Sequence, residues 1–208
     1  MIKTDGRMKS KRIRRLRRRE LPHDTVKLAR FLIGKTIVHE LPKGRLSGRI
    51  VETEAYLADD AACHAFRGPT PRNRALFLAH GHAYVYFCYG AHYMLNVSSE
   101  PAGVGSGILL RAMEPLEGIE WMKQYRKTTR MLDLARGPGR LAAALRITPR
   151  LDAQDLCGTG PLWLGTPVRP VGRIGVSVRI GITKDANRPL RFYERANPFV
   201  SGPKRLNS

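Results

Sequence analysis

The sequence predicts an α+β fold with a largely antiparallel sheet. At 208 residues the chain has the length of one domain, and it is long enough to bury a core without disulfides. Segments typical of strands outnumber segments typical of helices, and no internal repeat is present. The three cysteines are an odd number without C-x-x-C spacing, which argues against a disulfide framework.

The helical segments are marked by their ends. Asp24 is a suitable N-cap and Gly34 stands where a helix would end, so a helix is expected over residues 24–33. Further helices are expected over residues 116–126 and over residues 140–146, the latter led in by a Gly-Pro-Gly segment.

The remaining elements are expected to be strands and loops. Patterns of β-forming residues predict strands over residues 35–40, 45–56, 84–89, 93–99, 107–114, 173–182 and 190–193. Residues 41–44 are expected to form a turn. Residues 57–74 are polar and irregular and are expected to be a functional loop, and residues 158–172 are rich in Gly and Pro.

The charge of the chain points to a polyanionic partner. The sequence holds 37 Lys and Arg against 17 Asp and Glu, a formal net charge of +20 with a pI near 10.8. Residues 1–20 contribute +8 and are expected to be a basic, disordered arm, either solvated or in contact with phosphate. The rest, residues 21–208, is expected to be a single domain, and its charge of +12 favours nucleic acid as the partner.

The expected location follows from the absence of other signals in the sequence. No apolar run approaches the length of about 18 residues that a membrane span needs, and no apolar segment of a secretory signal follows the basic start. A cytoplasmic protein is expected, associated with the nucleoid in a bacterium or located in the nucleus in a eukaryote.

Two carboxylates stand close together in this basic chain, in the segment from Val51 to Tyr56. Period two in a strand puts Glu52, Glu54 and Tyr56 on one face. One carboxylate could deprotonate a water, and a pair about 6.6–7 Å apart could serve an inverting glycoside hydrolase. The alternative is that both acids are solvated or paired with basic residues.

Aromatic residues are concentrated in one segment. Five of the 15 fall within ten residues: Tyr84, Tyr86, Phe87, Tyr89 and Tyr93. Clustered tyrosines of a basic protein can stack on bases or wedge into a duplex, although aromatic residues on adjacent strands also commonly form core. Tyr89, next to a turn at Gly90, is better placed to be a wedge than a residue in the middle of a strand.

Metal and nucleotide motifs are not found. The cysteines and histidines between Cys63 and His92 fit no compact zinc spacing, and the zinc-deaminase signature is absent. The Gly-rich segments at residues 103–107 and 137–139 match neither the P-loop nor the full dinucleotide fingerprint. No metal and no cofactor are expected.

Taken together, these residues resemble the alkylpurine (3-methyladenine) DNA glycosylase family, of the small, monofunctional type without a helix-hairpin-helix. The resemblance covers residues 24–200. It is carried, in this order along the chain, by Arg49-Ile-Val-Glu-Thr-Glu-Ala-Tyr56, Pro71-Arg-Asn-Arg74, Tyr84-Val-Tyr-Phe-Cys-Tyr-Gly90, Asn96-Val-Ser-Ser99, Leu110-Arg-Ala-Met-Glu-Pro115, Gly137-Pro-Gly-Arg-Leu141 and Pro189-Leu-Arg-Phe-Tyr193.

The resemblance implies a repair enzyme for alkylation damage that flips a damaged purine out of double-stranded DNA and hydrolyses its N-glycosidic bond. The product is an abasic site, as in base excision repair. The range of substrates stays open among 3-methyladenine, 7-methylguanine, hypoxanthine and ethenoadenine. The family fold is a single domain with a curved sheet, flanking helices and a protruding hairpin that inserts into DNA, and it acts as a monomer without a cofactor.

The resemblance also implies roles for single residues. Glu54 matches the general base that activates the attacking water, and Arg111 matches the arginine that helps to hold this water. The side chains that match the pocket for the extruded base are Tyr56, His64, Tyr86 and Asn96. Tyr89 matches the tyrosine that intercalates into the DNA through the minor groove.

Two alternatives remain, and some features depart from the family pattern. A non-catalytic basic protein that binds nucleic acid such as RNA would also use the arm and the tyrosines, whereas the charge of +20 disfavours a glycoside hydrolase acting on neutral sugars. The arm has no counterpart in the shared core. The loop before His64 is short, and Cys63 stands where a small Ser or Ala is more usual.

Overall fold

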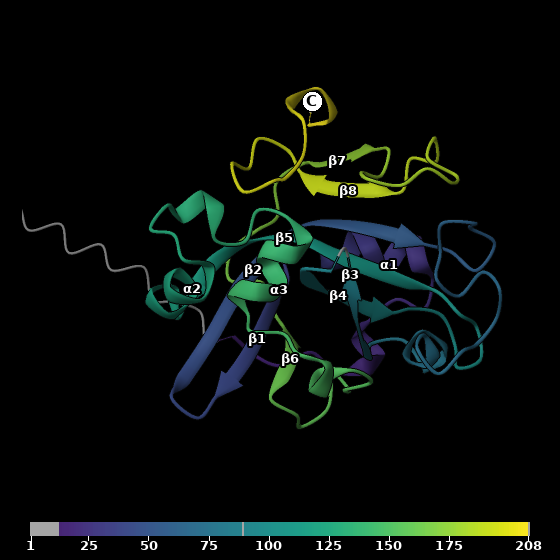
Figure 1. Ribbon diagram of the computed structural model, residues 1–208, viewed down its shortest axis with the longest axis horizontal. Helices are drawn as coiled ribbons and strands as arrows, with labels where there is room; N and C mark the ends of the chain where they lie inside the picture. The colour runs from purple at the N-terminus through teal and green to yellow at the C-terminus, as the bar shows by residue number, and fades with distance from the viewer. Residues whose placement is uncertain (1–12, 89, 208) are drawn as a thin grey trace, which may run out of the picture.

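The computed structural model describes residues 13–88 and 90–207. Over these residues the chain forms an eight-stranded, curled sheet in which all strand pairs are antiparallel (Figure 1). The strands are β1 Thr36–Leu41, β2 Gly44–Tyr56, β3 Ala83–Cys88, β4 His92–Ser98, β5 Gly107–Glu117, β6 Leu162–Gly165, β7 Ile174–Ser177 and β8 Arg191–Glu194. The predicted α+β class with a largely antiparallel sheet is confirmed.

The long strand β2 organises the sheet. The strand order is β3-β4-β5-β2-β1-β6, and β8 pairs with both β2 and β7. Along β2, residues 44–49 pair with β1 and residues 52–54 pair with β8, while residues 47–56 pair with β5. The two acidic residues predicted to matter therefore lie where β2 is flanked by a strand on each side.

Helices are fewer and short. They are α1 Thr25–Leu32, α2 Ile119–Arg126 and α3 Pro138–Ala144, with 3-10 helices at Arg18–Glu20, Arg74–Phe77, Met131–Asp133, Pro149–Leu151 and Lys204–Leu206. Asp24 caps α1 as predicted, because its carboxylate accepts a hydrogen bond of 2.7 Å from the backbone N–H of Lys27. Helix α2 begins later than predicted, since β5 continues to Glu117 and Gly118 turns the chain with a φ of +73°.

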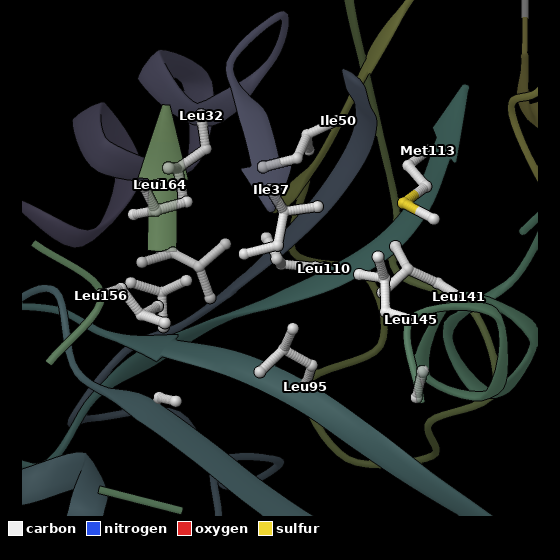
Figure 2. Close-up of a cluster of buried hydrophobic side chains, with 14 of the residues drawn as sticks. Leu32, Ile37, Ile50, Leu95, Leu110, Met113, Leu141, Leu145, Leu156 and Leu164 are labelled. Carbon is white, nitrogen blue, oxygen red and sulfur yellow. The ribbon is translucent and has the colours of Figure 1, made fainter. Parts of the chain in front are cut away.

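The main core lies between the sheet and the helices, and Figure 2 shows part of it. Its labelled members, all buried, are Leu32, Ile37, Ile50, Leu95, Leu110, Met113, Leu141, Leu145, Leu156 and Leu164. They come from α1, α3, five strands and the segment before β6. Each such side chain stabilises the fold by about 1.5–3 kcal/mol relative to its exposed state, so this core holds β2 and β5 rigidly.

The face of β2 that bears the acids is buried as well. Pairing of β2 with β5 is irregular between Ile50 and Thr53, which is typical of a β-bulge. Ala55 packs in the main core, whereas Val51 packs in a separate cluster. The expected alternation of side chains between the two faces of the strand therefore does not hold across the bulge, and holds only for the residues that follow it.

Residues 158–172 contain a strand that the sequence did not indicate. All four residues of β6 are buried, and β6 pairs with β1. The abundance of Gly and Pro around it hid a strand of only four residues. The predicted strands over residues 173–182 and 190–193 correspond to β7 and β8, of which β7 is shorter than expected.

The described part of the predicted basic arm is not disordered. Leu16 is buried, and its backbone N–H donates to the carbonyl of Leu164 at 2.8 Å. The guanidinium of Arg15 lies over the ring of Trp163, 4.6 Å from its centroid. Residues 13–20 thus pack on the domain, and residues 1–12 lie outside the described part of the chain.

Strands β3 and β4 pair as a hairpin from Ala83 to Cys88, and position 89 lies outside the described residues.

Among the helices of the described residues, none is long and apolar enough to pass through a bilayer.

Docking of residues 13–20 can be tested by shortening Leu16. We expect Leu16→Ala to lower the free energy of unfolding by about 2–5 kcal/mol, because it leaves a cavity in a buried position. Urea unfolding followed by circular dichroism measures this change. Arg19→Ala, at an exposed position of the same segment, is the matched control and should leave stability nearly unchanged. Equal stability of the two variants would contradict the packing of this segment.

Candidate active site

A cavity opens beside the end of β2. Its volume is about 320 Å³, within the range of about 300–1,000 Å³ usual for small-molecule sites. Its walls come from β2, β3, β4, β5, the loop after β2, the start of α3 and the segment after β7. The lining residues are Tyr56, Ala62, Cys63, His64, Leu76, Tyr84, Tyr86, Cys88, Met94, Asn96, Gly107, Leu109, Arg111, Pro138, Ile180, Gly181 and Ile182.

Glu54 lies directly behind this lining. Its side chain is fully buried, and its carboxylate is held by three residues that line the cavity. The hydroxyl of Tyr56 donates to Oε2 at 2.9 Å, and the backbone N–H of Ile180 donates to Oε1 at 2.8 Å. Nη1 of Arg111 lies 3.2 Å from Oε1. The carboxylate is thereby fixed in one orientation at the wall of the cavity.

The charge state of Glu54 is set by opposing effects. Burial raises the pKa of the Glu54 carboxyl, because the charged form loses its hydration. The charge of Arg111, the amide of Ile180 and the hydroxyl of Tyr56 favour the carboxylate and oppose this rise. The result is a carboxylate more basic than an exposed one, which suits the acceptance of a proton.

Arg111 connects Glu54 to Glu52. This arginine is nearly buried, with 7% of its surface exposed, and its Nε donates to Oε1 of Glu52 at 3.1 Å. One guanidinium therefore contacts both acids of the strand. The shared partner also shows that the two carboxylates point to the same side of β2, as predicted, although this side is buried.

Glu52 differs from Glu54 in its electrostatic surroundings. Burial alone would raise the pKa of Glu52, but Arg111, Arg191 and the amide of Ser201 hold this pKa below its usual value. These contacts favour the charged form of Glu52, and Glu52 does not line the cavity.

Aromatic rings form much of the cavity wall. The rings of His64 and Tyr86 have centroids 4.5 Å apart, and Tyr84 stacks on Tyr86 with centroids 5.2 Å apart. Tyr84 and Tyr86 stand two residues apart along β3, so their side chains lie on the same face of the strand. The guanidinium of Arg179 lies 4.6 Å from the centroid of the Tyr56 ring. It thus occupies one face of that ring.

The surroundings of His64 favour its neutral form. Its Nδ1 lies 2.9 Å from the hydroxyl of Tyr84. Burial lowers the pKa of His64, and the nearby charge of Arg72 lowers it further. The lowered pKa favours the uncharged imidazole, and Arg111 is the one Lys or Arg side chain among the described residues that line the cavity.

Asn96 faces the cavity from the neighbouring strand. The β3–β4 register places it opposite Tyr84, and its Nδ2 donates to the carbonyl of Tyr84 at 3.2 Å. The side chain is 6% exposed. With Nδ2 held in this way, the amide is fixed against the cavity wall and can discriminate between ligands by shape.

A second, polar cavity adjoins the first. Its volume is about 350 Å³, and Arg111 lines both cavities. The other lining residues of the second cavity are Arg136, Gly137, Arg140, Ser201 and Gly202. The site thus combines a cavity lined by aromatic rings with a neighbouring, more open cavity lined by three arginines.

The structure brings together most of the site residues predicted from the sequence. Tyr56, His64, Tyr86, Asn96 and Arg111 line one cavity, and Glu54 lies behind it. Tyr89 lies outside the described residues. The roles of these residues stay predictions.

Three further parts of the site received no individual role from the sequence. Tyr84 was named only as a member of the aromatic cluster, although it stands two residues from Tyr86 on the same strand and therefore on the same face. Arg179 and the amide of Ile180 lie more than 120 residues from Glu54 in the sequence, and no local pattern indicates them.

Comparison with known proteins identifies the family of the chain. Residues 19–198 match the family described as methylpurine-DNA glycosylase (MPG). A protein of Mesorhizobium japonicum named "Putative 3-methyladenine DNA glycosylase" is 64% identical over 189 residues, which cover 91% of each chain. Proteins with the same name from Paraburkholderia phytofirmans and Chlorobaculum tepidum are 53% and 47% identical, covering 92% and 85% of this chain and 90% and 86% of theirs. The chain therefore belongs to the methylpurine-DNA glycosylase family.

Proposed function

We propose that this protein is a monofunctional DNA repair glycosylase that flips alkylated purines out of double-stranded DNA and hydrolyses their N-glycosidic bond. Membership of the family makes the chain a DNA glycosylase, and the name shared by its relatives suggests 3-methyladenine as a substrate. The observation that carries the proposal is the buried carboxylate of Glu54 at the wall of an aromatic cavity.

The cavity suits a flat, positively charged base. Alkylation at N3 or N7 gives a purine a positive charge, and aromatic faces attract cations by about 0.5–2 kcal/mol. Arg179 occupies one face of Tyr56, which leaves the other face for the base, while His64 and Tyr86 supply further ring surface. A base must leave the duplex to reach such a cavity, and damaged or mispaired bases do so at the lowest cost.

The chemistry follows from Glu54 and Arg111. Glu54 takes a proton from a water molecule, the water oxygen bonds to C1′ of the deoxyribose, and the bond from C1′ to the purine breaks with its electron pair going to the base. The sugar passes through a state with positive charge, which the carboxylate also stabilises. Arg111 and the amide of Ile180 hold Glu54 in place for this step.

Specificity against normal purines is assigned to Asn96. Its amide is tied to the backbone of Tyr84, so it cannot move aside without losing a hydrogen bond. The 2-amino group of guanine would be crowded by it, which disfavours normal guanine with its strong glycosidic bond. 7-Methylguanine carries the same amino group, but its positive charge and its weakened glycosidic bond offset this crowding.

The surface charge explains how the enzyme finds DNA. A net charge of +20 attracts phosphate and releases counterions, which gives binding without regard to sequence. The protein is expected to scan DNA in this way as a monomer, while the cavity selects the damaged base.

Glu54→Gln tests the general base. Glutamine keeps the size of the side chain but cannot accept the proton, so excision under single-turnover conditions should fall by about 10²–10⁴-fold. The assay measures free base released from a duplex with one 7-methylguanine, and binding to the same duplex serves as the control for folding. Full excision by Glu54→Gln would exclude Glu54 as the base. Binding of DNA by the wild type without release of any base would favour a non-catalytic nucleic-acid-binding protein.

The pH dependence of excision tests the environment of Glu54. The base must be charged, and burial raises its pKa above the ordinary value of 4.5. Activity should therefore be lost as the pH falls through this raised pKa, at a pH above 4.5. Since 7-methylguanine already carries a positive charge, its departure needs no further proton, and the acidic side of the profile reports the base.

Two variants test whether Glu54 is the group whose titration limits the acidic side of this pH profile. Glu54→Asp alters the environment of the carboxyl group and should displace the acidic side of the profile, whereas His64→Asn should leave its midpoint in place. A profile that moves with His64 instead would assign the titration to the imidazole.

Tyr89→Ala tests the proposed intercalating residue, which follows the last residue of β3 in the sequence. Loss of one stacking ring should weaken binding to a duplex with an abasic site about tenfold, since such contacts contribute about 1–3 kcal/mol. Phe87→Ala is the matched control, because it removes an exposed ring from β3. Unchanged affinity in Tyr89→Ala, or an equal loss in both variants, would remove Tyr89 from this role.

A further inference from the structure

Glu52 is the buried carboxylate that the proposed reaction does not use. It is fully buried, and both of its oxygens are occupied. Oε1 accepts from Nε of Arg111 at 3.1 Å and from Nε of Arg191 at 2.6 Å, and Oε2 accepts from the backbone N–H of Ser201 at 2.7 Å. These partners come from β5, β8 and the C-terminal segment, so Glu52 joins three separate parts of the chain.

The geometry of Arg111 depends on this contact. A guanidinium is planar and rigid, so fixing one of its nitrogens fixes the direction of the others. Glu52 holds Nε of Arg111, and this places Nη1 at 3.2 Å from Oε1 of Glu54. Within the described residues, Glu52 and Glu54 are the acidic partners of this guanidinium, so loss of the Glu52 carboxylate would leave Nε without its anchor.

Arg191 fixes Glu52 in turn. Arginine has five N–H donors, and those of Arg191 reach five acceptors, of which Glu52 is one. The other four acceptors are Oγ of Ser177, the carbonyls of Leu206 and Ser201, and Oδ1 of Asn207, at 2.6–3.0 Å. The C-terminal segment is thereby tied to the carboxylate that orients Arg111.

We propose that Glu52 is a positioning residue of the reaction, which holds Arg111 against Glu54 and shares the charge of that arginine, and that Arg191 holds Glu52 for this purpose. The inference rests on the proposed function of Glu54 as the general base.

The four groups form a line of alternating charge, in the order Glu54, Arg111, Glu52, Arg191. If Glu52 became neutral, Arg111 would act on Glu54 alone and make it a weaker base. If Arg191 became neutral, two carboxylates would share one arginine and Glu54 would become a stronger base. The other groups that face Glu54 are the hydroxyl of Tyr56, the amide of Ile180 and, across the ring of Tyr56, Arg179 paired with Asp60.

The test compares pH profiles of single-turnover excision from a duplex with 7-methylguanine. We expect Glu52→Gln to move the acidic side of the profile to lower pH and Arg191→Met to move it to higher pH. A separation of about one pH unit corresponds to about a tenfold difference in rate at a pH below both midpoints. Arg191→Lys keeps the charge and should restore most of the wild-type profile.

A purely structural role predicts a different result. Both variants would then lower the melting temperature and the amount of active enzyme, while the midpoint of the profile stayed that of the wild type. That outcome would overturn the proposal, and so would a shift of both variants in the same direction. Binding to a duplex with an abasic site controls for the folded fraction.

Removing one partner of a buried ion pair can prevent folding, so a double variant is included. Glu52→Gln with Arg191→Met removes both charges together and leaves Arg111 to Glu54 alone, and its profile should move to lower pH. An unchanged midpoint in this variant would contradict the inference. The Glu54→Gln assay separates failure of the proposed function from failure of this inference. Full excision by Glu54→Gln would reject Glu54 as the general base. Loss of excision by Glu54→Gln, together with unchanged pH profiles in the Glu52 and Arg191 variants, would reject only the positioning role of Glu52.

Discussion

The burial of two carboxylates in one strand is the constraint on which the site depends. A buried charge is costly unless it is paired and hydrogen-bonded, and Glu52 and Glu54 are both fully buried. Strand β2 can bury both charges because, at the position of the acids, it pairs with β5 on one edge and with β8 on the other. Each neighbouring strand contributes one arginine, Arg111 or Arg191, to the line of alternating charge. The strand order of the sheet thus brings an arginine to each buried carboxylate of β2.

The aromatic cavity is coupled to this charged line through Tyr56. Its ring lines the cavity and its hydroxyl donates to Glu54, so the surface proposed to hold the base and the proposed catalyst belong to one side chain and its neighbour on the strand. Burial and the nearby carboxylate raise the pKa of the Tyr56 hydroxyl, which therefore stays a donor. On the other wall, the β3–β4 register sets Asn96 opposite Tyr84. Glu54, Tyr56, Tyr86, Asn96 and Arg111 all stand on strands, whereas His64 and Ile180 reach the cavity from segments between strands.

Local patterns predicted what lies within single strands, and missed what depends on the pairing of distant strands. Alternation along β2 and β3 was enough to group Glu54 with Tyr56 and to point to Tyr86. The cap at Asp24 and the glycines after helices gave the ends of α1. Strand β6 escaped notice because four residues among Gly and Pro carry little periodicity, and its burial comes from pairing with β1. The packing of Leu16 was hidden by the arginines around it. The contact of the Ile180 amide with Glu54 spans 126 positions in the sequence, and only the folded chain reveals it.

The distribution of charge explains how a carboxylate can serve a protein that attracts polyanions. Among the buried residues of the described chain, the charged ones are four arginines and four acids: Arg49, Arg111, Arg179, Arg191, Glu52, Glu54, Asp60 and Glu194. Each arginine has an acidic partner within this set. The interior is therefore neutral, and the excess of +20 belongs to the rest of the chain. That outer charge is available to attract phosphate, while the buried carboxylate of Glu54 is oriented by its neighbours and has its pKa raised by burial. Long-range binding and local chemistry are in this way governed by separate sets of charges, so one can change without the other.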